Sequence, residues 1–144
     1  MKVLVLCTGN SCRSQMAHGF LQSFGKELTV RSAGTEPAQK VNPRAVRVMR
    51  EAGIDISSHK PTPVGKYLKE PWDFVITVCD NARETCPVFT GTVKNRIHIG
   101  FEDPWLATGT EEYVMGVYRK VRDGIKERFY NLYIEKMNNN QSKS

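Results

Sequence analysis

The chain has 144 residues, 40% of them hydrophobic and 25% charged, which is typical of one globular domain with a single core. Lys and Arg number 21 against 15 Asp and Glu, but these basic residues are scattered, which argues against a nucleic-acid partner and suits a small anion. The sequence contains neither a signal peptide nor an apolar run of about 18 residues, so we expect no membrane contact and a cytoplasmic location.

Four short apolar runs are predicted as strands, because each is bounded by polar or turn-forming residues. They are KVLVL (2–6), LTVRSAG (28–34), DFVITV (73–78) and RIHIG (96–100). Apolar residues at helical spacing predict three helices between and after these strands. The helices run from Met16 to Gly25, from an N-cap at Asn42 to Gly53, and from a capping box at Thr108 and Glu111 to Leu132.

Strands that alternate with helices predict a three-layer α/β fold, in which a four-stranded parallel sheet has helices on both faces. We expect residues 1–137 to form a single domain and the polar residues 138–144 to be a disordered tail. Ligands of such sheets bind beyond the carboxyl ends of the strands. Cys7, Cys79 and Gly100 each follow a predicted strand, so their loops should meet at one edge of the sheet.

The segment CTGNSCRS (7–14) joins the first strand to the first helix and places Cys7 and Arg13 at C-x5-R spacing. Gly9 permits a close backbone approach and Asn10 tolerates a left-handed conformation, so the loop amides can surround an anion. The helix that follows and Arg13 add positive charge, which favours a nucleophilic thiolate at Cys7. The alternative is a buried structural cysteine beside a surface arginine. The expected oxyanion-binding residues are Thr8, Gly9, Asn10, Ser11, Cys12, Arg13 and Ser14.

The segment CTGNSCRSQMA resembles the catalytic loop of the low-molecular-weight protein tyrosine phosphatase fold family. The resemblance extends through RSAGT (31–35), AGIDISSH (52–59), DFVITVCD (73–80) and FEDP (101–104), and therefore covers most of the chain. It implies a low-molecular-weight phosphatase-like fold and a catalytic domain that acts through Cys7. In that family the Asp of an Asp-Pro pair is the general acid. The resemblance gives this role to Asp103, with a turn or helix-cap residue as the alternative.

Two chemistries fit such a loop. A phosphatase needs Cys7 to attack phosphorus, Arg13 to bind the oxyanion and Asp103 to protonate the leaving oxygen. Arsenate has the shape and charge of phosphate, but arsenic(V) is readily reduced by thiols, and this reduction requires a second thiol. The segment VCDNARETCPVF supplies Cys79 and Cys86 at C-x6-C spacing. In this respect the chain resembles the thioredoxin-coupled arsenate reductases.

That resemblance implies a thiol relay for arsenical resistance. Cys7 attacks arsenate, Cys79 attacks the Cys7 sulfur and releases arsenite, and Cys86 carries the disulfide outward to thioredoxin. The predicted catalytic residues are Cys7, Cys79, Cys86, Arg13 and Asp103. A low-molecular-weight protein tyrosine phosphatase is the alternative, weakened because the segment DPWLATG after the general acid offers Trp105 and no tyrosine. A non-enzymatic oxyanion-binding or thiol-sensing module would need the same loop without turnover.

We expect no cofactor and no metal. The cysteine spacings match zinc sites only in part, and no pair of histidines accompanies them. Some related reductases bind a potassium ion through acids at positions where this chain has His18 and Thr62. Asn10 and Ser32 match the remaining ligands but suit a hard cation poorly by themselves. We expect His18 on the exposed side of its helix and assign Cys12 no redox role.

Overall fold

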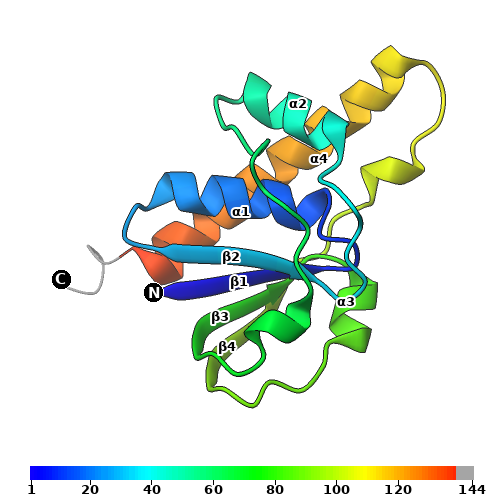
Figure 1. Cartoon of the computed structure of the whole chain (residues 1–144). Coiled ribbons are helices and arrows are strands. Elements are labelled where there is room, and N and C mark those ends of the chain that lie inside the picture. The colour runs from blue at the N-terminus through cyan, green and yellow to red at the C-terminus, as the bar shows by residue number, and fades with distance from the viewer. Residues whose placement is uncertain (139–144) are drawn as a thin grey trace.

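The computed structural model describes residues 1–138, and a four-stranded parallel sheet forms its centre (Figure 1). The strands are β1 (Lys2–Cys7), β2 (Thr29–Gly34), β3 (Trp72–Thr77) and β4 (Val93–His98), in the order β2-β1-β3-β4. In the central strand β1, Leu6 pairs with Ala33 on one side and with Thr77 on the other. This parallel sheet confirms the fold class predicted from the alternation of strands and helices.

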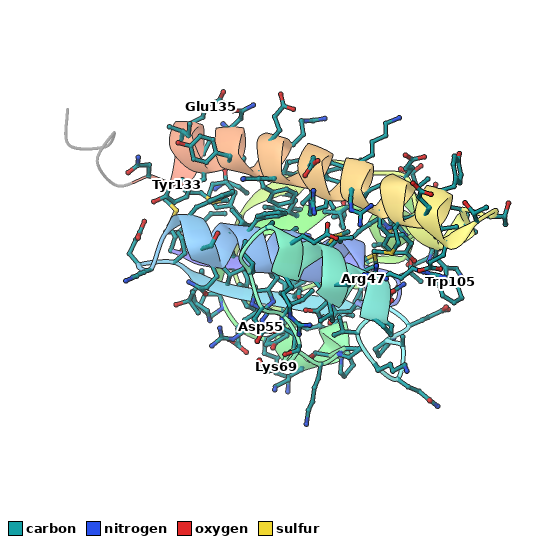
Figure 2. All side chains as sticks on the ribbon, turned by 90° about the horizontal axis from the view of Figure 1, so that it is seen from above. Arg47, Asp55, Lys69, Trp105, Tyr133 and Glu135 are labelled. Carbon is teal, nitrogen blue, oxygen red and sulfur yellow. The ribbon has the colours of Figure 1, made fainter. Side chains whose placement is uncertain are left out.

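The helices cover the sheet on both faces. Their bounds are α1 (Arg13–Phe24), α2 (Pro43–Glu51), α3 (Asp80–Thr85) and α4 (Glu111–Leu132), with short helical turns η1 (Val64–Tyr67), η2 (Pro104–Leu106) and η3 (Tyr133–Met137). Seen from above, α1, α2 and α4 lie together over the sheet (Figure 2). The crossover through α1 and the crossover through α3 run in opposite directions along the sheet. Because connections between parallel strands are right-handed, the two helices belong on opposite faces.

Local sequence explains most of the helix boundaries. The Asn42 side chain accepts a hydrogen bond from the Arg44 amide, and Pro43 occupies the first turn, as predicted for α2. The predicted capping box of the last helix is wrong. Thr110, rather than Thr108, caps α4 by accepting from the Tyr113 amide. Gly109 has a φ of 126°, so the chain turns between the two threonines and only the second reaches the helix.

The core lies between the sheet and the pair α1 and α4. Apolar residues at helical spacing in α4 face inward, including Tyr118, Ile125 and Phe129, which are fully buried. Within residues 1–138, no helix is both long and apolar enough to span a bilayer. Of the polar tail predicted over 138–144, residues 139–144 lie outside the described part of the chain.

The topology places two cysteines at the same point of the sheet. From β1 the chain crosses to β2, whereas from β3 it crosses to β4, so the direction of winding reverses between β1 and β3. Cys7 is the last residue of β1, and Cys79 follows β3 and caps α3. A hydrogen bond from the Val78 amide to the Leu6 carbonyl holds these strand ends together. Such a switch point is where open α/β sheets bind their ligands.

Candidate active site

Most carbonyl groups of the loop after β1 accept hydrogen bonds from the segment 35–42. The carbonyls of Cys7, Thr8, Gly9 and Ser11 accept hydrogen bonds of 2.8–3.2 Å from the amides of Thr35, Glu36, Ala38 and Asn42. The carbonyl and amide of one peptide unit point in opposite directions. The loop amides therefore face the cavity that Cys7 lines, where they can donate to an anion.

Asn10 supports the loop from within. Its φ is 50°, so it takes the left-handed conformation that the sequence predicted as tolerable here. Its side chain donates to the Ser14 hydroxyl (2.8 Å) and accepts from the Thr62 amide (2.9 Å). The Asn10 side chain is fully buried, and both of its hydrogen-bond partners are groups of the protein itself. Asn10 and Ser14, which were expected to bind the oxyanion, therefore have a supporting contact with each other.

Gly34 is a site residue that sequence analysis missed. A methyl group added to its α-carbon would lie 2.5 Å from the Thr8 carbonyl oxygen and 3.1 Å from the Asn10 amide. The loop can pack against the end of β2 only because this position lacks a side chain. A methyl group added at Gly9 would make only an ordinary contact, 3.6 Å from the Ser11 hydroxyl oxygen. Gly34 therefore provides a close backbone approach within the protein, and the approach of an anion to the backbone at Gly9 stays a prediction.

Arg13 begins α1 and reaches back to the FEDP segment. One terminal nitrogen donates to the Phe101 carbonyl (3.1 Å), and the other lies 3.5 Å from the Asp103 carboxylate. Among the described residues, no acceptor lies within hydrogen-bond distance of its buried Nε. An unpaired buried donor costs free energy, and a bound oxyanion would supply the missing acceptor.

Asp103 has the capping role, and its position is compatible with the role of general acid as well. It caps η2, with one carboxylate oxygen accepting from the Trp105 amide (3.0 Å). The other oxygen faces Arg13. Asp103 also lines the cavity that contains Cys7, a position suitable for a group that protonates a leaving oxygen there.

Cys7 and Cys79 lie side by side, although they come from different strands. Both are buried, and a hydrogen bond links their thiols. The Cys79 sulfur also lies 3.3 Å from the Thr8 hydroxyl. The Asn81 side chain donates to that hydroxyl (2.9 Å), which leaves the Thr8 hydrogen free to point at the Cys79 sulfur. Sequence analysis did not anticipate the contribution of Asn81.

The two neighbouring thiols shift each other's pKa in opposite directions. The hydrogen bond from Cys7 lowers the pKa of Cys79 to about 5, and Thr8, the Ala82 amide and Arg13 act in the same direction. The same hydrogen bond, together with burial, raises the pKa of Cys7. The thiolate was expected on Cys7. In the anion-free loop the hydrogen bonds that the Cys79 sulfur accepts favour its charged form.

Cys86 and Cys12 lie apart from this pair in different ways. Cys86 ends α3, is half-buried and faces a cavity of about 260 Å³ lined by Val75, Thr77, Arg96, Ile97 and His98. Along α3, its α-carbon is about 10 Å from that of Cys79. Cys12 is buried at the start of α1, and burial, followed by the charge of Asp103, raises its pKa to about 12. The structure thus brings Cys7, Cys79, Arg13 and Asp103 together, without Cys86.

Two openings lead to the thiol pair. The Cys7 cavity, of about 440 Å³, is lined by the loop and by a rim that includes Lys40 and Trp105. Figure 2 shows Trp105 beside the N-terminal end of α4. The Cys79 cavity, of about 670 Å³, is lined by Cys79, Asn81 and residues 100–103. Thr8, Arg13 and Asp103 line both cavities and form the wall between them.

The positions that hold potassium in some related reductases do not fit a hard cation here. His18 is partly buried and hydrogen-bonded to Ser32 (2.9 Å), and its ring lies tilted against that of His59, with 4.5 Å between ring centroids. The expectation that it lies on the exposed side of α1 is therefore wrong. Burial and the neighbouring His59 lower its pKa to about 3. Within residues 1–138, no cluster of three or more His, Cys, Asp or Glu could hold a metal ion.

Comparison with known proteins places this site in a family. Residues 2–143 match the family described as low molecular weight phosphotyrosine protein phosphatase. The arsenate reductase of Halalkalibacterium halodurans is 47% identical over 127 residues, 88% of this chain and 90% of its own length. A solved arsenate reductase in the phosphate binding state is 34% identical with a TM-score of 0.79, over 93% of this chain and 97% of that chain. An arsenate reductase in the oxidized state has a TM-score of 0.79 and 33% identity, over the same shares of the two chains. The chain therefore belongs to the low molecular weight phosphotyrosine protein phosphatase family, in which these similar proteins are arsenate reductases.

Proposed function

We propose that this protein reduces arsenate to arsenite through a thiol relay of Cys7, Cys79 and Cys86 that thioredoxin regenerates. The observation that carries the proposal is the contact between the Cys7 and Cys79 thiols beside Arg13. Hydrolysis of a phosphate ester would need only the first of these thiols. A reduction needs both, close enough to form a disulfide. The arsenate reductases among the relatives support the same conclusion.

Arsenate binds in the Cys7 cavity against the loop amides. There it supplies an acceptor for the buried Nε of Arg13 and competes with Asp103 for the terminal guanidinium nitrogen. Arg13 suits this exchange because its planar fork binds a tetrahedral oxyanion through two parallel hydrogen bonds. Displaced from Arg13, Asp103 becomes available to protonate an arsenate oxygen that leaves as water.

The reduction then proceeds in two steps. The Cys7 sulfur bonds to arsenic, an As–O bond breaks, and the oxygen leaves as water with the thiol proton and a proton from the cavity. Cys79 next attacks the Cys7 sulfur, forming the Cys7–Cys79 disulfide and breaking the S–As bond. The electron pair of that bond stays on arsenic, which departs as arsenite after taking up protons. Cys7 no longer carries a proton at this stage, so the hydrogen bonds from Thr8 and the Ala82 amide and the charge of Arg13 are what favour the nucleophilic thiolate form of Cys79.

Cys86 completes the relay at the far end of α3. It attacks Cys79, which releases the Cys7 thiol and leaves a Cys79–Cys86 disulfide for thioredoxin to reduce. This exchange requires α3 to move, because a disulfide holds its α-carbons within about 7 Å. A cycle that starts from free thiols needs a reducing compartment, so we place it in the cytosol.

The test is arsenate turnover by the purified chain with two reducing systems. NADPH oxidation should be sustained when thioredoxin and thioredoxin reductase are present. The glutathione and glutaredoxin system should serve poorly, because the released disulfide is internal rather than mixed with a small thiol. Equal rates in the two systems would reject the thioredoxin coupling. Absence of arsenate turnover in both would reject the reductase function.

Phosphomonoester hydrolysis is the second candidate. The Cys7 cavity is larger than an inorganic oxyanion requires and has Trp105 on its rim, which would contact an organic group. Cys7, Arg13 and Asp103 would carry out that reaction without Cys79. Robust hydrolysis of an aryl phosphate by a chain that gives no arsenite would make this candidate the function.

A further inference from the structure

A cavity of about 270 Å³ opens between β2, α1 and the loop over residues 58–62, and it shares no lining residue with the Cys7 cavity. Its floor is polar, because the side chains of Gln15, Ser32 and Tyr67 are buried there. Its rim carries Arg31 and Lys60, which are both exposed. The cavity therefore combines hydrogen-bonding groups with positive charge, at a place that the proposed relay does not use.

The charged groups that line this cavity are positive. Among the described residues, no Asp or Glu lines it, and neither Arg31 nor Lys60 forms an ion pair. The Arg31 guanidinium donates to the Val30 carbonyl (2.9 Å), which uses one of its five donors. Burial is the first cause that lowers the pKa of His18, and the charges of His59 and Arg31 follow. Such an effect requires these groups to lie close together, so their positive charges gather at one place.

We propose that this cavity binds a small tetrahedral oxyanion, such as inorganic phosphate or sulfate, as a second anion site of the chain. The planar fork of Arg31 can bind two oxygens at once, and the Lys60 ammonium can neutralise charge from the rim. Ser58 and Tyr67 line the same cavity and add neutral hydroxyl donors. Cys7 takes no part in this binding, so the inference goes beyond the proposed function and does not rest on it.

His59 links the second anion site to the loop after β1. The Gln15 amide nitrogen donates to the Asn10 carbonyl (3.1 Å), so the Gln15 oxygen accepts from His59 Nδ1 (2.9 Å). The Nδ1 atom therefore carries a proton, and Nε2 becomes a second donor when the ring is protonated. The Gln15 side chain alone thus connects His59 with Asn10, the left-handed residue of the loop.

Anion binding at this site should strengthen as the pH falls. Burial lowers the pKa of His59, and the Asp55 carboxylate acts in the opposite direction. An anion beside the ring would favour its protonated form, so binding takes up a proton and gains a donor. The groups around the ring are His18 from α1, Arg31 from β2, Tyr67 from η1, and Asp55 and Lys60 from its own loop.

The experiment titrates the full chain with sodium sulfate and follows the titration by NMR, with sodium chloride keeping the ionic strength constant. Sulfate is the probe because its charge, unlike that of phosphate, does not change between mildly acidic and neutral pH. The ring signals of His18 and His59 should shift along one binding curve, and the amides of residues 8–14 along another. The pKa of His59 should be higher with sulfate bound than without it.

Two substitutions at the rim test the assignment. Arg31→Gln and Lys60→Gln should each weaken the sulfate binding reported by the histidine signals by about 10-fold, the loss expected for one hydrogen bond to a charged group. Lys126→Gln is the matched control, because it removes the same charge from α4 at a residue that does not line the cavity. Arg31→Gln should retain arsenate turnover, which shows that this variant folds.

Three outcomes would overturn the second anion site. Equal responses of the histidine signals to sulfate and to chloride would mean that the salt only screens charge. Loss of the histidine response in Arg13→Gln, which impairs the Cys7 cavity, would mean that these signals report the first anion. Equal sulfate affinity in Arg31→Gln and Lys126→Gln would reject the assigned residues. The titration itself uses the unmodified chain, and absence of arsenate turnover in that chain would reject the proposed function while leaving the sulfate curves in place.

Discussion

The hydroxyl oxygen of Thr8 lies 3.3 Å from the sulfur of Cys79, although 71 positions separate the two residues. Thr8 belongs to the loop after β1 and Cys79 to the segment after β3, which are neighbouring strands. Asn81 extends the link by donating to the same hydroxyl. The loop after β1 and the Cys79 thiol are therefore connected, and Thr8 lowers the pKa of the sulfur that attacks Cys7 in the proposed relay.

Thr8→Val should slow the release of arsenite while leaving oxyanion binding largely intact. Removing a hydrogen bond to a charged sulfur costs about 1.5–3 kcal/mol, so we expect the release step to slow by roughly 10- to 100-fold and the pKa of Cys79 to rise. Thr8→Ser keeps the hydroxyl and should retain most of the rate. Single-turnover kinetics and the pH dependence of Cys79 alkylation provide the two measurements. Equal rates for Thr8→Val and Thr8→Ser would show that the contact is unimportant.

Cys86→Ser should permit one turnover and then stall. Cys7 and Cys79 are in contact in the structure, so the chemistry up to arsenite release needs neither Cys86 nor thioredoxin. We expect one arsenite per chain and a Cys7–Cys79 disulfide that peptide mapping identifies. Cys79→Ser is the matched variant and should release no arsenite. Sustained turnover by Cys86→Ser, with thioredoxin as the reductant, would remove Cys86 from the mechanism.

Oxidation should disorder α3. Its α-helical residues separate the α-carbons of Cys79 and Cys86 by about 10 Å, which exceeds the roughly 7 Å limit for a disulfide. In Cys7→Ser, which restricts the relay to the last two cysteines, amide exchange over residues 79–90 should increase on oxidation. Cys7→Ser combined with Cys86→Ser, treated with the same oxidant, should show no change. Identical protection in the two redox forms of Cys7→Ser would rule out the rearrangement.

Gly34→Ala should destabilise the protein and impair oxyanion binding together. The new methyl group would meet the Thr8 carbonyl at 2.5 Å, so the loop must move or β2 must bend. We expect a loss of about 1–3 kcal/mol in the free energy of unfolding, measured with urea, and weaker binding of phosphate. Gly65→Ala is the control, because nothing lies within 4 Å of the added group there. If Gly34→Ala behaved like Gly65→Ala, the close approach would have no functional importance.

His18 should make the protein less stable at mildly acidic pH. Its pKa is about 3 in the folded protein and about 6.5 in the unfolded chain, so folding favours the neutral ring. The stabilisation is fully present above pH 6.5 and is lost as the pH falls toward 3. His18 alone should cost about 2 kcal/mol between pH 8 and pH 5. His18→Gln should flatten this slope in urea unfolding, and an unchanged slope would assign the effect to other groups, such as His59.

Much of the architecture follows from short-range features of the sequence. Buried strands, the apolar faces of helices and the N-cap at Asn42 each depend on residues that are close to one another in the sequence. Alternation of these elements then permits few arrangements other than a parallel sheet, whose carboxyl edge must gather the loops after β1 and β3. The sequence by itself could therefore place Cys7 and Cys79 at the same edge, and the C-x5-R spacing could mark the loop as an oxyanion site.

Only the tertiary structure decided how these residues act on one another. Gly34 matters because another segment of backbone crosses it, and hydrogen bonds from Cys7 and Thr8 lower the pKa of Cys79. His18 is covered by His59, which approaches from a loop 41 positions away. Burial, proton sharing and steric contact depend on distances between segments that fold together. Periodicity along a chain records which face of an element is buried, but not which neighbour buries it.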